Sequence, residues 1–332
     1  MKKITIKDVA REAGVSVATV SNALNNLDVV QPKTREHVLA VAQRLNYIPN
    51  AMGKRLRGGQ SSAIGLFVSA IAGVYYGSLT ETMHYALQKQ GYELQVYITD
   101  SVHTIMEKLT GHNLDGAIIH CNSFNEAQAD ALNRLGVPIV FLDMEKTGAK
   151  MSGVLFESYE NGYMAADYLL GLGHKRLMHI FGVPGNYDSE QRFRGYAQAL
   201  KDAGMAVEPE YVLNGRFERA TAYREMRRFL QEGHTPPDAV FAANDYSAIG
   251  CIEALREFGL RVPEDVSVMG CDDNALCDFV SPKLTTIRLS ERDQATYAAR
   301  EVLRLLSQSG GRVERISGAL IVRGTCKIRT ED

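Results

Sequence analysis

The stretch TIKDVAREAGVSVATVSNALN (residues 5–25) predicts two short helices joined by a tight turn. Thr5 and Asp8 have the spacing of a capping box, and the apolar residues that follow recur at helical intervals. Gly14 suits the left-handed exit from the first helix, and Ser16 caps a second helix that runs to about Leu24. This order of helix, glycine turn and helix is typical of a helix-turn-helix unit.

A third helix completes the unit. Pro32 occupies a favourable first position, because its missing N–H needs no partner there. In TREHVLAVAQRLNYIPNA (residues 34–51) the apolar side chains return every three or four positions. Three short helices around one core predict an all-α head, residues 1–48.

Charge is unevenly distributed along the chain. Residues 1–60 hold ten basic and four acidic residues, a net charge of +6. The whole chain carries -2, which leaves -8 for the remainder. A basic segment on an acidic chain indicates a polyanionic partner such as nucleic acid, and the alternative is a solvated basic surface.

Residues 5–25 and 34–51 together closely resemble the lactose/galactose repressor (LacI/GalR) family. The resemblance implies a helix-turn-helix domain that binds double-stranded operator DNA, and a homodimer that reads an inverted repeat. By position, the second helix enters the major groove, and short polar side chains around it contact phosphates. The residues placed on DNA in this way are Thr5, Ser16, Val17, Ala18, Thr19, Ser21, Asn22, Asn25 and Thr34.

Asn22 departs from the commonest family pattern, in which Arg occupies this position. Arg binds guanine through two hydrogen bonds, whereas Asn prefers adenine. We therefore expect the base preference at this operator position to shift away from guanine. Val17 and Ala18 are small and apolar, so they can contact a thymine methyl group but cannot form paired hydrogen bonds.

Residues 49–61 are predicted to form a hinge helix and a linker. Asn50 caps a short helix from Ala51 to about Arg57, and GGQSS (residues 58–62) follows as a flexible tether. The resemblance implies that this helix orders on DNA and inserts Leu56 into a minor-groove step. Asn50, Lys54 and Arg55 are the expected DNA contacts beside it. The alternative is an ordinary linker with an incidental leucine.

From Ser62 onward, short apolar runs alternate with amphipathic stretches. This alternation predicts parallel, doubly wound sheets, and the length favours two lobes. The resemblance implies an α/β body (residues 62–332) like the periplasmic binding proteins, with three chain crossings between lobes. The expected first lobe comprises residues 62–157 and 288–317, and the expected second lobe comprises residues 158–287 and 318–332.

Ligands of such sheets bind beyond the carboxyl ends of the strands. The ends of the predicted strands supply candidate effector-binding residues: Ser69, Asp143, Phe156, Asn244, Asp245 and Asp272. The resemblance adds Val74, Tyr75, Tyr76, Arg192 and Phe217. Polar side chains of these types bind vicinal hydroxyls, and aromatic rings cover the apolar face of a sugar. Asn and Asp at strand ends also cap helices, so capping is an alternative for Asn244 and Asp245.

We expect no catalysis, cofactor or metal site. The sequence contains no GxSxG, HExxH, P-loop or GxGxxG motif, and its eight histidines form no ligand-like cluster. The five cysteines are odd in number and include no CxxC, which favours a reducing cytoplasm. No apolar run reaches the roughly 18 residues of a membrane span, so no membrane partner is expected. The N-terminus resembles no secretory segment.

The leading prediction is therefore a cytoplasmic, effector-responsive transcriptional repressor that acts as a homodimer. A sugar between the two lobes is the predicted effector, which points to carbohydrate-utilisation genes. One alternative is a repressor activated by a purine or by a phosphocarrier-protein co-repressor. Another is a sugar-binding transport receptor, which the basic segment and the missing signal peptide disfavour.

Overall fold

The computed structural model describes residues 4–24, 27–47, 61–111, 113–121, 124–142 and 144–329. The chain separates into two compact units, Met1–Ser61 and Ser62–Asp332, and each is described by itself. The expected hinge helix lies outside the described residues, so its fold stays a prediction. The same holds for six of the candidate site residues: Asn25, Asn50, Lys54, Arg55, Leu56 and Asp143.

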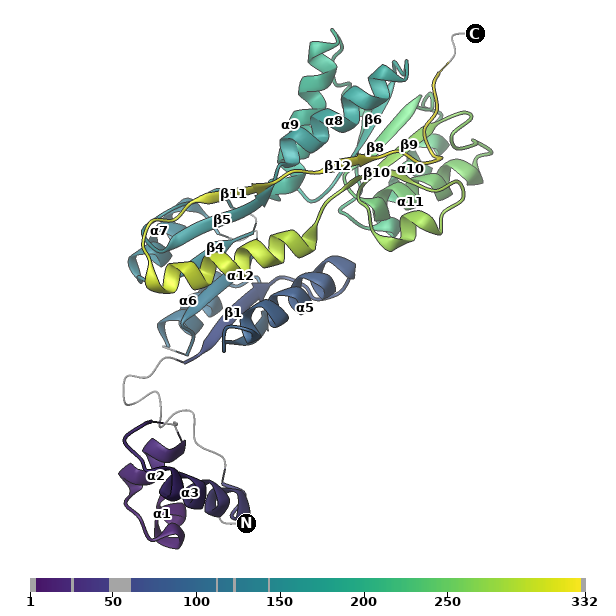
Figure 1. Ribbon diagram of the computed structural model, residues 1–332. Coiled ribbons are helices and arrows are strands. Elements are labelled where there is room, and N and C mark those ends of the chain that lie inside the picture. The colour runs from purple at the N-terminus through teal and green to yellow at the C-terminus, as the bar shows by residue number, and fades with distance from the viewer. Residues whose placement is uncertain are drawn as a thin grey trace. The chain divides into compact units, whose positions relative to one another are not determined.

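Three helices pack around one small core in the head, as predicted (Figure 1). The N–H and the hydroxyl of Thr5 both donate to the Asp8 carboxylate, at 2.9 and 2.6 Å. Gly14 follows the first helix with a φ of 65°, a left-handed conformation that glycine adopts without strain. The core consists largely of valines and alanines. The helices are α1 (Ile6–Ala13), α2 (Val17–Leu24) and α3 (Pro32–Arg44).

Two six-stranded sheets form the body, which confirms the prediction of two doubly wound α/β lobes. The first sheet runs in the order β11 (Val313–Ile316), β5 (Met151–Phe156), β4 (Ile139–Phe141), β3 (Gly116–His120), β1 (Ala63–Val68) and β2 (Glu93–Ile98). The second runs in the order β12 (Ala319–Ile321), β10 (Thr285–Arg288), β9 (Ser267–Asp272), β8 (Ala239–Ala242), β6 (Leu177–Phe181) and β7 (Val212–Asn214). The strands pair in parallel, except that β12 is antiparallel to β10.

Helices cover both faces of the first sheet. Ile64, Leu66 and Val68 of β1 pack with one pair of helices, α5 (Val74–Gln88) and α12 (Glu291–Ser307). Ala63 and Phe67 pack with the other pair, α6 (Val102–Thr110) and α7 (Glu126–Arg134). This alternation is the two-residue period of a strand that is buried on both sides.

The second sheet is covered in the same way. Met178 and Ile180 of β6 belong to the core that α10 (Arg219–Gln231) and α11 (Asp245–Glu257) cover. Leu177 packs in the core of the opposite face, under α8 (Ser158–Gly171) and α9 (Tyr187–Asp202). Two short 3-10 helices complete the second lobe, η1 (Pro209–Tyr211) and η2 (Ala275–Asp278).

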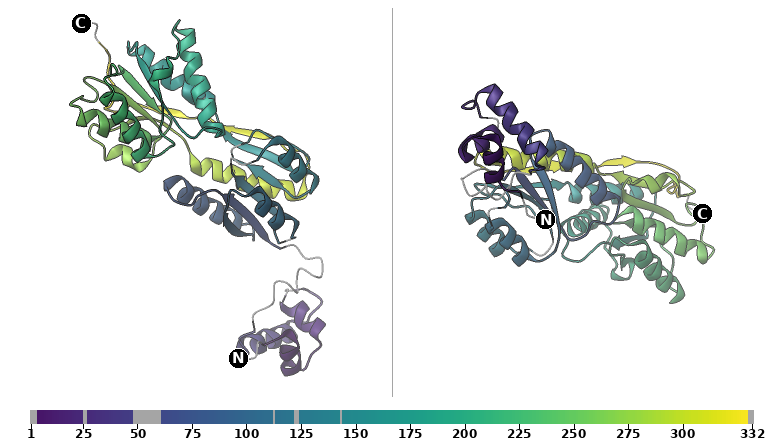
Figure 2. Two further views of the ribbon diagram at one scale, coloured as in Figure 1. Left: turned by 180° about the vertical axis from the view of Figure 1, so that it is seen from behind. Right: turned by 90° about the horizontal axis from the view of Figure 1, so that it is seen from below.

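The chain crosses between the sheets three times, from β5 into α8, from β10 into α12 and from β11 into β12 (Figure 2). One expected lobe boundary is wrong by a residue, because Arg288 pairs with Asp272 in the second sheet. The sequence patterns did not predict β7, β10, β11 or α6. Strands β7 and β11 are short edge strands with polar residues, so they form no apolar run.

Candidate DNA-binding surface and effector site

Helix α2 carries five of the eight described residues that are predicted to contact DNA. Val20 is fully buried in the head core, so the opposite face of the helix is directed outward. Val17 lies four residues before Ser21, and Ala18 lies four residues before Asn22. Residues four apart share one face of a helix, so Ala18 and Asn22 form an outward patch, with Val17 and Ser21 at its edge. Ala18 is exposed, whereas Val17, Thr19, Ser21 and Asn22 are half-buried.

Ser16 and Thr19 fix the start of α2. The Ser16 Oγ accepts a hydrogen bond from the Thr19 N–H at 3.0 Å, and the two hydroxyl oxygens lie 2.8 Å apart. Ser16 is exposed, so this pair lies at the surface of the head. Helix N-termini attract anions because their first N–H groups lack helical partners. The position of Ser16 and Thr19 at the start of α2 is compatible with the phosphate contacts predicted for them. Those contacts stay predictions.

Three predicted DNA contacts are less available than the sequence implied. Val17 packs against the head core, so only part of its side chain can reach a thymine methyl group. The Thr5 hydroxyl already donates to Asp8, whose negative charge opposes a phosphate at that place. Thr34 is half-buried in the first turn of α3.

Arg192 on α9 is the centre of a charged group in the body. Its side chain is buried, and its Nη1 donates to the Ala243 carbonyl at 2.7 Å. Burial opposes the charge, but Cys271, Asp188 and Asp272 raise the pKa of Arg192 above its ordinary value. Its buried Nε has no hydrogen-bond partner among the described residues. A charged guanidinium with an unused donor is suited to bind an oxygen atom of a ligand.

Asp272 ends β9 at the carboxyl edge of the second sheet. Its φ of 123° is a strained conformation for a residue with a side chain, and such strain gathers at functional sites. Burial raises its pKa well above the ordinary value, and Asp245 raises it further, while Arg192 opposes the rise. Glu291, at the start of α12, adds to the negative charge around it. We call Asp188, Arg192, Asp272 and Glu291 the Arg192 cluster.

Asn244 and Asp245 hold the start of α11. Asn244 Oδ1 accepts the N–H three residues later at 2.9 Å, and its Nδ2 donates to the Phe217 carbonyl at 3.1 Å. Asp245 is fully buried and accepts the Thr286 hydroxyl at 2.6 Å and the Asn274 N–H at 2.8 Å. These bonds use both side chains inside the fold. The structure thus favours the capping alternative for Asn244, whereas the Asp245 carboxylate holds Thr286 and the Asn274 N–H.

Tyr75, Tyr76 and His120 form an aromatic group at the carboxyl edge of the first sheet. The His120 ring centroid lies 5.4 Å from that of Tyr75 and 5.6 Å from that of Tyr76. Burial lowers the pKa of His120, and Asp188 in the second lobe raises it. Because Asp188 acts on His120, the aromatic group lies near the Arg192 cluster. The His120 Nδ1 is buried and has no hydrogen-bond partner among the described residues.

The other candidates lie in different settings. The Tyr75 hydroxyl donates to Gln294 Oε1 at 2.8 Å, which ties this residue to α12. Phe156 belongs to the buried core, and its expected contact with an effector stays a prediction. Phe217 packs against Gly182, where an added Cβ would lie 2.3 Å from the ring. The two remaining candidates, Ser69 and Val74, are exposed.

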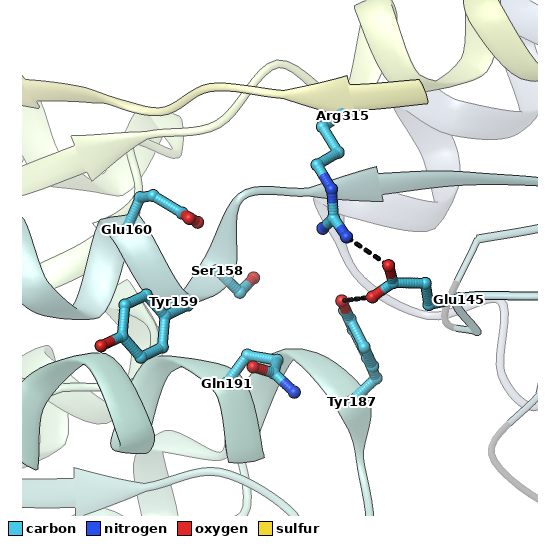
Figure 3. A pocket seen from close by; sticks show the side chains of 7 residues that line it. All are labelled: Glu145, Ser158, Tyr159, Glu160, Tyr187, Gln191 and Arg315. Atoms are coloured by element: carbon cyan, nitrogen blue, oxygen red, sulfur yellow. Dashed lines mark hydrogen bonds and ion pairs between the residues drawn. The ribbon is translucent and has the colours of Figure 1, made fainter. Parts of the chain in front are cut away.

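A cavity of about 310 Å³ adjoins this region (Figure 3). It touches the Arg192 cluster through Ser158, whose hydroxyl donates to Asp188 Oδ1 at 2.6 Å. None of the predicted effector residues lines it. Among the described residues predicted to bind the effector, Arg192 has a buried nitrogen without a hydrogen-bond partner, and His120 of the aromatic group has another. The cavity is lined by Glu145, Ser158, Tyr159, Glu160, Tyr187, Gln191 and Arg315.

Sequence reasoning missed Asp188, Glu291 and His120. His120 stands at the end of an apolar run, so the rule that selected other strand ends could have selected it. Asp188 lies four residues before Arg192, on the same face of one helix. Glu291 is brought close to Asp272 by the crossing from β10 into α12. The sequence does not locate this crossing to a single residue.

The described ranges contain no group of three or more His, Cys, Asp or Glu side chains placed to hold a metal ion. In those same ranges, no helix combines the length and the apolar character that crossing a membrane requires. The five cysteines are free, and four of them are buried.

Two family matches cover the head and most of the second half of the body. Residues 5–50 match the bacterial regulatory proteins of the lacI family, and residues 166–326 match the periplasmic binding protein-like domain. The HTH-type transcriptional repressor PurR of Pasteurella multocida is 34% identical over 292 residues, which are 86% of this chain and 87% of that protein. PurR of Haemophilus influenzae strain PittEE is 32% identical over 333 residues, with 97% and 98% covered.

Solved structures agree with these matches. The Lac repressor dimer bound to operator and the anti-inducer ONPF has a TM-score of 0.86 at 28% identity, covering 98% of this chain and 100% of that one. The complex of the transcriptional regulator CelR with cellobiose has a TM-score of 0.73 at 27% identity, covering 97% of this chain and 99% of that one.

Proposed function

This chain belongs to the lacI family of bacterial regulatory proteins, and from that premise we propose that it represses transcription from an operator whose affinity a sugar controls. The sugar binds between the two lobes, at the Arg192 cluster and the aromatic group. The regulated genes serve carbohydrate use. The protein works by binding rather than by catalysis, and it acts in the cytoplasm.

The outward patch of α2 supports sequence-specific DNA binding. Short polar and small apolar side chains on one face of a helix fit the floor of the major groove, while the opposite face is held by the head core. A single head reads few base pairs, so a homodimer that reads an inverted repeat supplies the remaining specificity. The similarity to the Lac repressor dimer on operator supports the same arrangement.

The unpartnered Arg192 Nε is the observation that carries the effector assignment. Around it, carboxylates from α9 and β9 offer acceptors for sugar hydroxyls, and the rings of Tyr76 and His120 offer an apolar face. CelR, with 27% identity, is described in complex with cellobiose, which favours a sugar here. An effector alters operator affinity only through its different affinity for two lobe arrangements.

A purine co-repressor is the second candidate. The PurR relatives are 30–34% identical and cover most of the chain, which is the observation in its favour. An aromatic group facing an arginine and carboxylates also suits a planar base with donors and acceptors at its edge.

In-vitro selection of bound sequences from a random duplex library, at about physiological salt, tests the proposal. We expect an inverted repeat to be enriched. Titration of that operator complex with ribose, cellobiose, adenine and guanine then distinguishes the two effector classes. Failure to enrich any sequence, with or without these compounds, would contradict operator binding. A response to a purine base and to neither sugar would favour the second candidate.

A further inference from the structure

Three side chains form a link between the lobes beside the cavity (Figure 3). Arg315 on β11 and Glu145 after β4 belong to the first lobe, and the Arg315 Nη2 lies 2.6 Å from Glu145 Oε1. Tyr187, the first residue of α9, belongs to the second lobe and donates its hydroxyl to Glu145 Oε2 at 3.2 Å. The carboxylate of Glu145 therefore joins a strand of one lobe to a helix of the other.

The protonation states of Glu145 and Tyr187 strengthen the hydrogen bond between them. The hydrogen bond from Arg315 lowers the pKa of Glu145, so its carboxylate is charged near neutral pH. Burial raises the pKa of Tyr187, so its hydroxyl keeps the proton that it donates. A hydrogen bond to a charged acceptor is stronger than one between neutral groups.

The first six residues of α9 contribute to two sites. Tyr187 and Gln191 line the cavity, whereas Asp188 and Arg192 belong to the Arg192 cluster. Residues four apart share a helix face, and successive residues are turned by about 100°. The two sites thus lie on neighbouring faces at the start of α9, and a ligand that moves Asp188 or Arg192 also moves the Tyr187 hydroxyl.

The first half of α9 packs closely against α8. A Cβ on Gly162 of α8 would lie 1.9 Å from the Arg192 carbonyl oxygen, and one on Gly195 of α9 would lie 1.9 Å from the Tyr159 carbonyl oxygen. The two backbones are therefore in direct contact. Because α8 follows β5 at a chain crossing, a displacement of α9 is passed to the connection between the lobes.

We propose that Tyr187 is a positioning residue, whose hydrogen bond to Glu145 stabilises the present lobe arrangement and is displaced when the Arg192 cluster binds its ligand. The inference rests on the proposed function, in which the lobe arrangement sets operator affinity. It adds a residue outside the predicted effector site and a route from that site to the other lobe.

Tyr187→Phe in the full-length chain removes the hydroxyl and keeps the ring. Tyr163→Phe is the matched control, because its hydroxyl also donates to a carboxylate at 3.2 Å, to Asp202 Oδ2 within the second lobe. Hydrogen exchange followed by mass spectrometry is the first measurement. We expect exchange at residues 144–147 of the first lobe to rise at least about threefold in Tyr187→Phe and to stay unchanged in Tyr163→Phe. No rise at residues 144–147 in Tyr187→Phe, or equal rises in both variants, would overturn the link.

Affinity for the selected operator is the second measurement, and Glu145→Gln completes a double-mutant cycle. We expect Tyr187→Phe to change operator affinity by at least about threefold, and the double variant to differ little from the stronger single variant. Additive effects, or an unchanged affinity in Tyr187→Phe, would contradict the coupling. If selection enriches no operator, the proposed function fails, while the exchange experiment still decides whether Tyr187 joins the lobes.

Discussion

The head and the body differ in how far apart along the chain the residues of their candidate sites lie. In the head, most of the described residues that are predicted to contact DNA lie between Ser16 and Asn22, within one helix and its cap. In the body, the Arg192 cluster extends from Asp188 to Glu291 and takes residues from three elements. A site within one helix keeps its geometry wherever that helix forms, whereas the second site exists only when two sheets and their crossings are in place.

The two regions also differ in what holds them together. The head core is small and is built largely of valines and alanines. The body has large cores on both faces of two sheets, with phenylalanines, leucines and isoleucines at their centres. Because a small core leaves little excess stability, we expect single core changes to abolish the function of the head, and the body to tolerate them better.

Acid sensitivity tests the core of the body. His179 is fully buried among aromatic rings, and burial lowers its pKa to about 3. The unfolded chain binds a proton at this residue below about pH 6.5, so acid stabilises the unfolded state. The loss grows as the pH falls from about 6.5 toward the folded-state pKa of about 3, where it totals about 5 kcal/mol, and about 3 kcal/mol is lost by pH 4.5. Urea unfolding at pH 7 and pH 4.5 measures the loss.

His179→Leu removes this titration. Between pH 7 and pH 4.5, the free energy of unfolding of the variant should fall by about 3 kcal/mol less than that of the unchanged protein. The same pH dependence in both proteins would show that His179 does not carry it.

Arg192→Met tests how much the body depends on one buried charge. The change leaves Asp188 and Asp272 without their counter-ion, and we expect a loss of about 4 kcal/mol of unfolding free energy. Arg194→Met, two residues along the same helix and exposed, should change it little. Urea unfolding at neutral pH measures both. Equal losses in the two variants would mean that the cluster has no special energetic role.

Val38→Asn tests the small core of the head. Val38 is fully buried, and an amide in its place costs about 3 kcal/mol, enough to unfold a head of this size. We expect operator affinity to fall by roughly 100-fold or more while the unfolding of the body is unchanged. The control is Leu39→Asn on the same helix, where the side chain is 44% exposed. A similar loss of affinity in both variants would point to DNA contact by α3 rather than to the core.

Asn22→Arg tests recognition within the single helix. Arg fits guanine and Asn fits adenine, so the variant should prefer guanine at that operator position by about 2 kcal/mol. Base-resolved selection with both proteins measures the change. A profile that demands guanine already with Asn22 would contradict the assignment of this residue to a base edge.

Thr5→Ala has the smallest expected effect. Thr5 caps α1 through Asp8, and the loss of an exposed cap costs about 1 kcal/mol. Thermal melting of the head, followed by NMR of the full-length chain, should show a lower midpoint than for Lys7→Ala. Equal midpoints would mean that the cap adds nothing measurable to the head.

The sequence by itself determined the head and the architecture class of the body. Thr5, Gly14, Ser16 and Pro32 mark helix ends by local chemistry, so the three helices follow from residues a few positions apart. Alternating apolar runs likewise predicted two parallel sheets. The edge strands β7 and β11 were missed because their segments are too short to form an apolar run, and they are stabilised by pairing, which a local pattern does not contain.

Only the tertiary structure decided which candidate side chains are accessible to a ligand. Asp245 and Phe156 matched the strand-end rule, yet both are buried inside the fold. Asp188, His120 and the link from Tyr187 to Glu145 depend on which faces of separate elements meet. Strand ends are visible along the chain, but burial and facing partners arise from packing between residues that are distant in sequence.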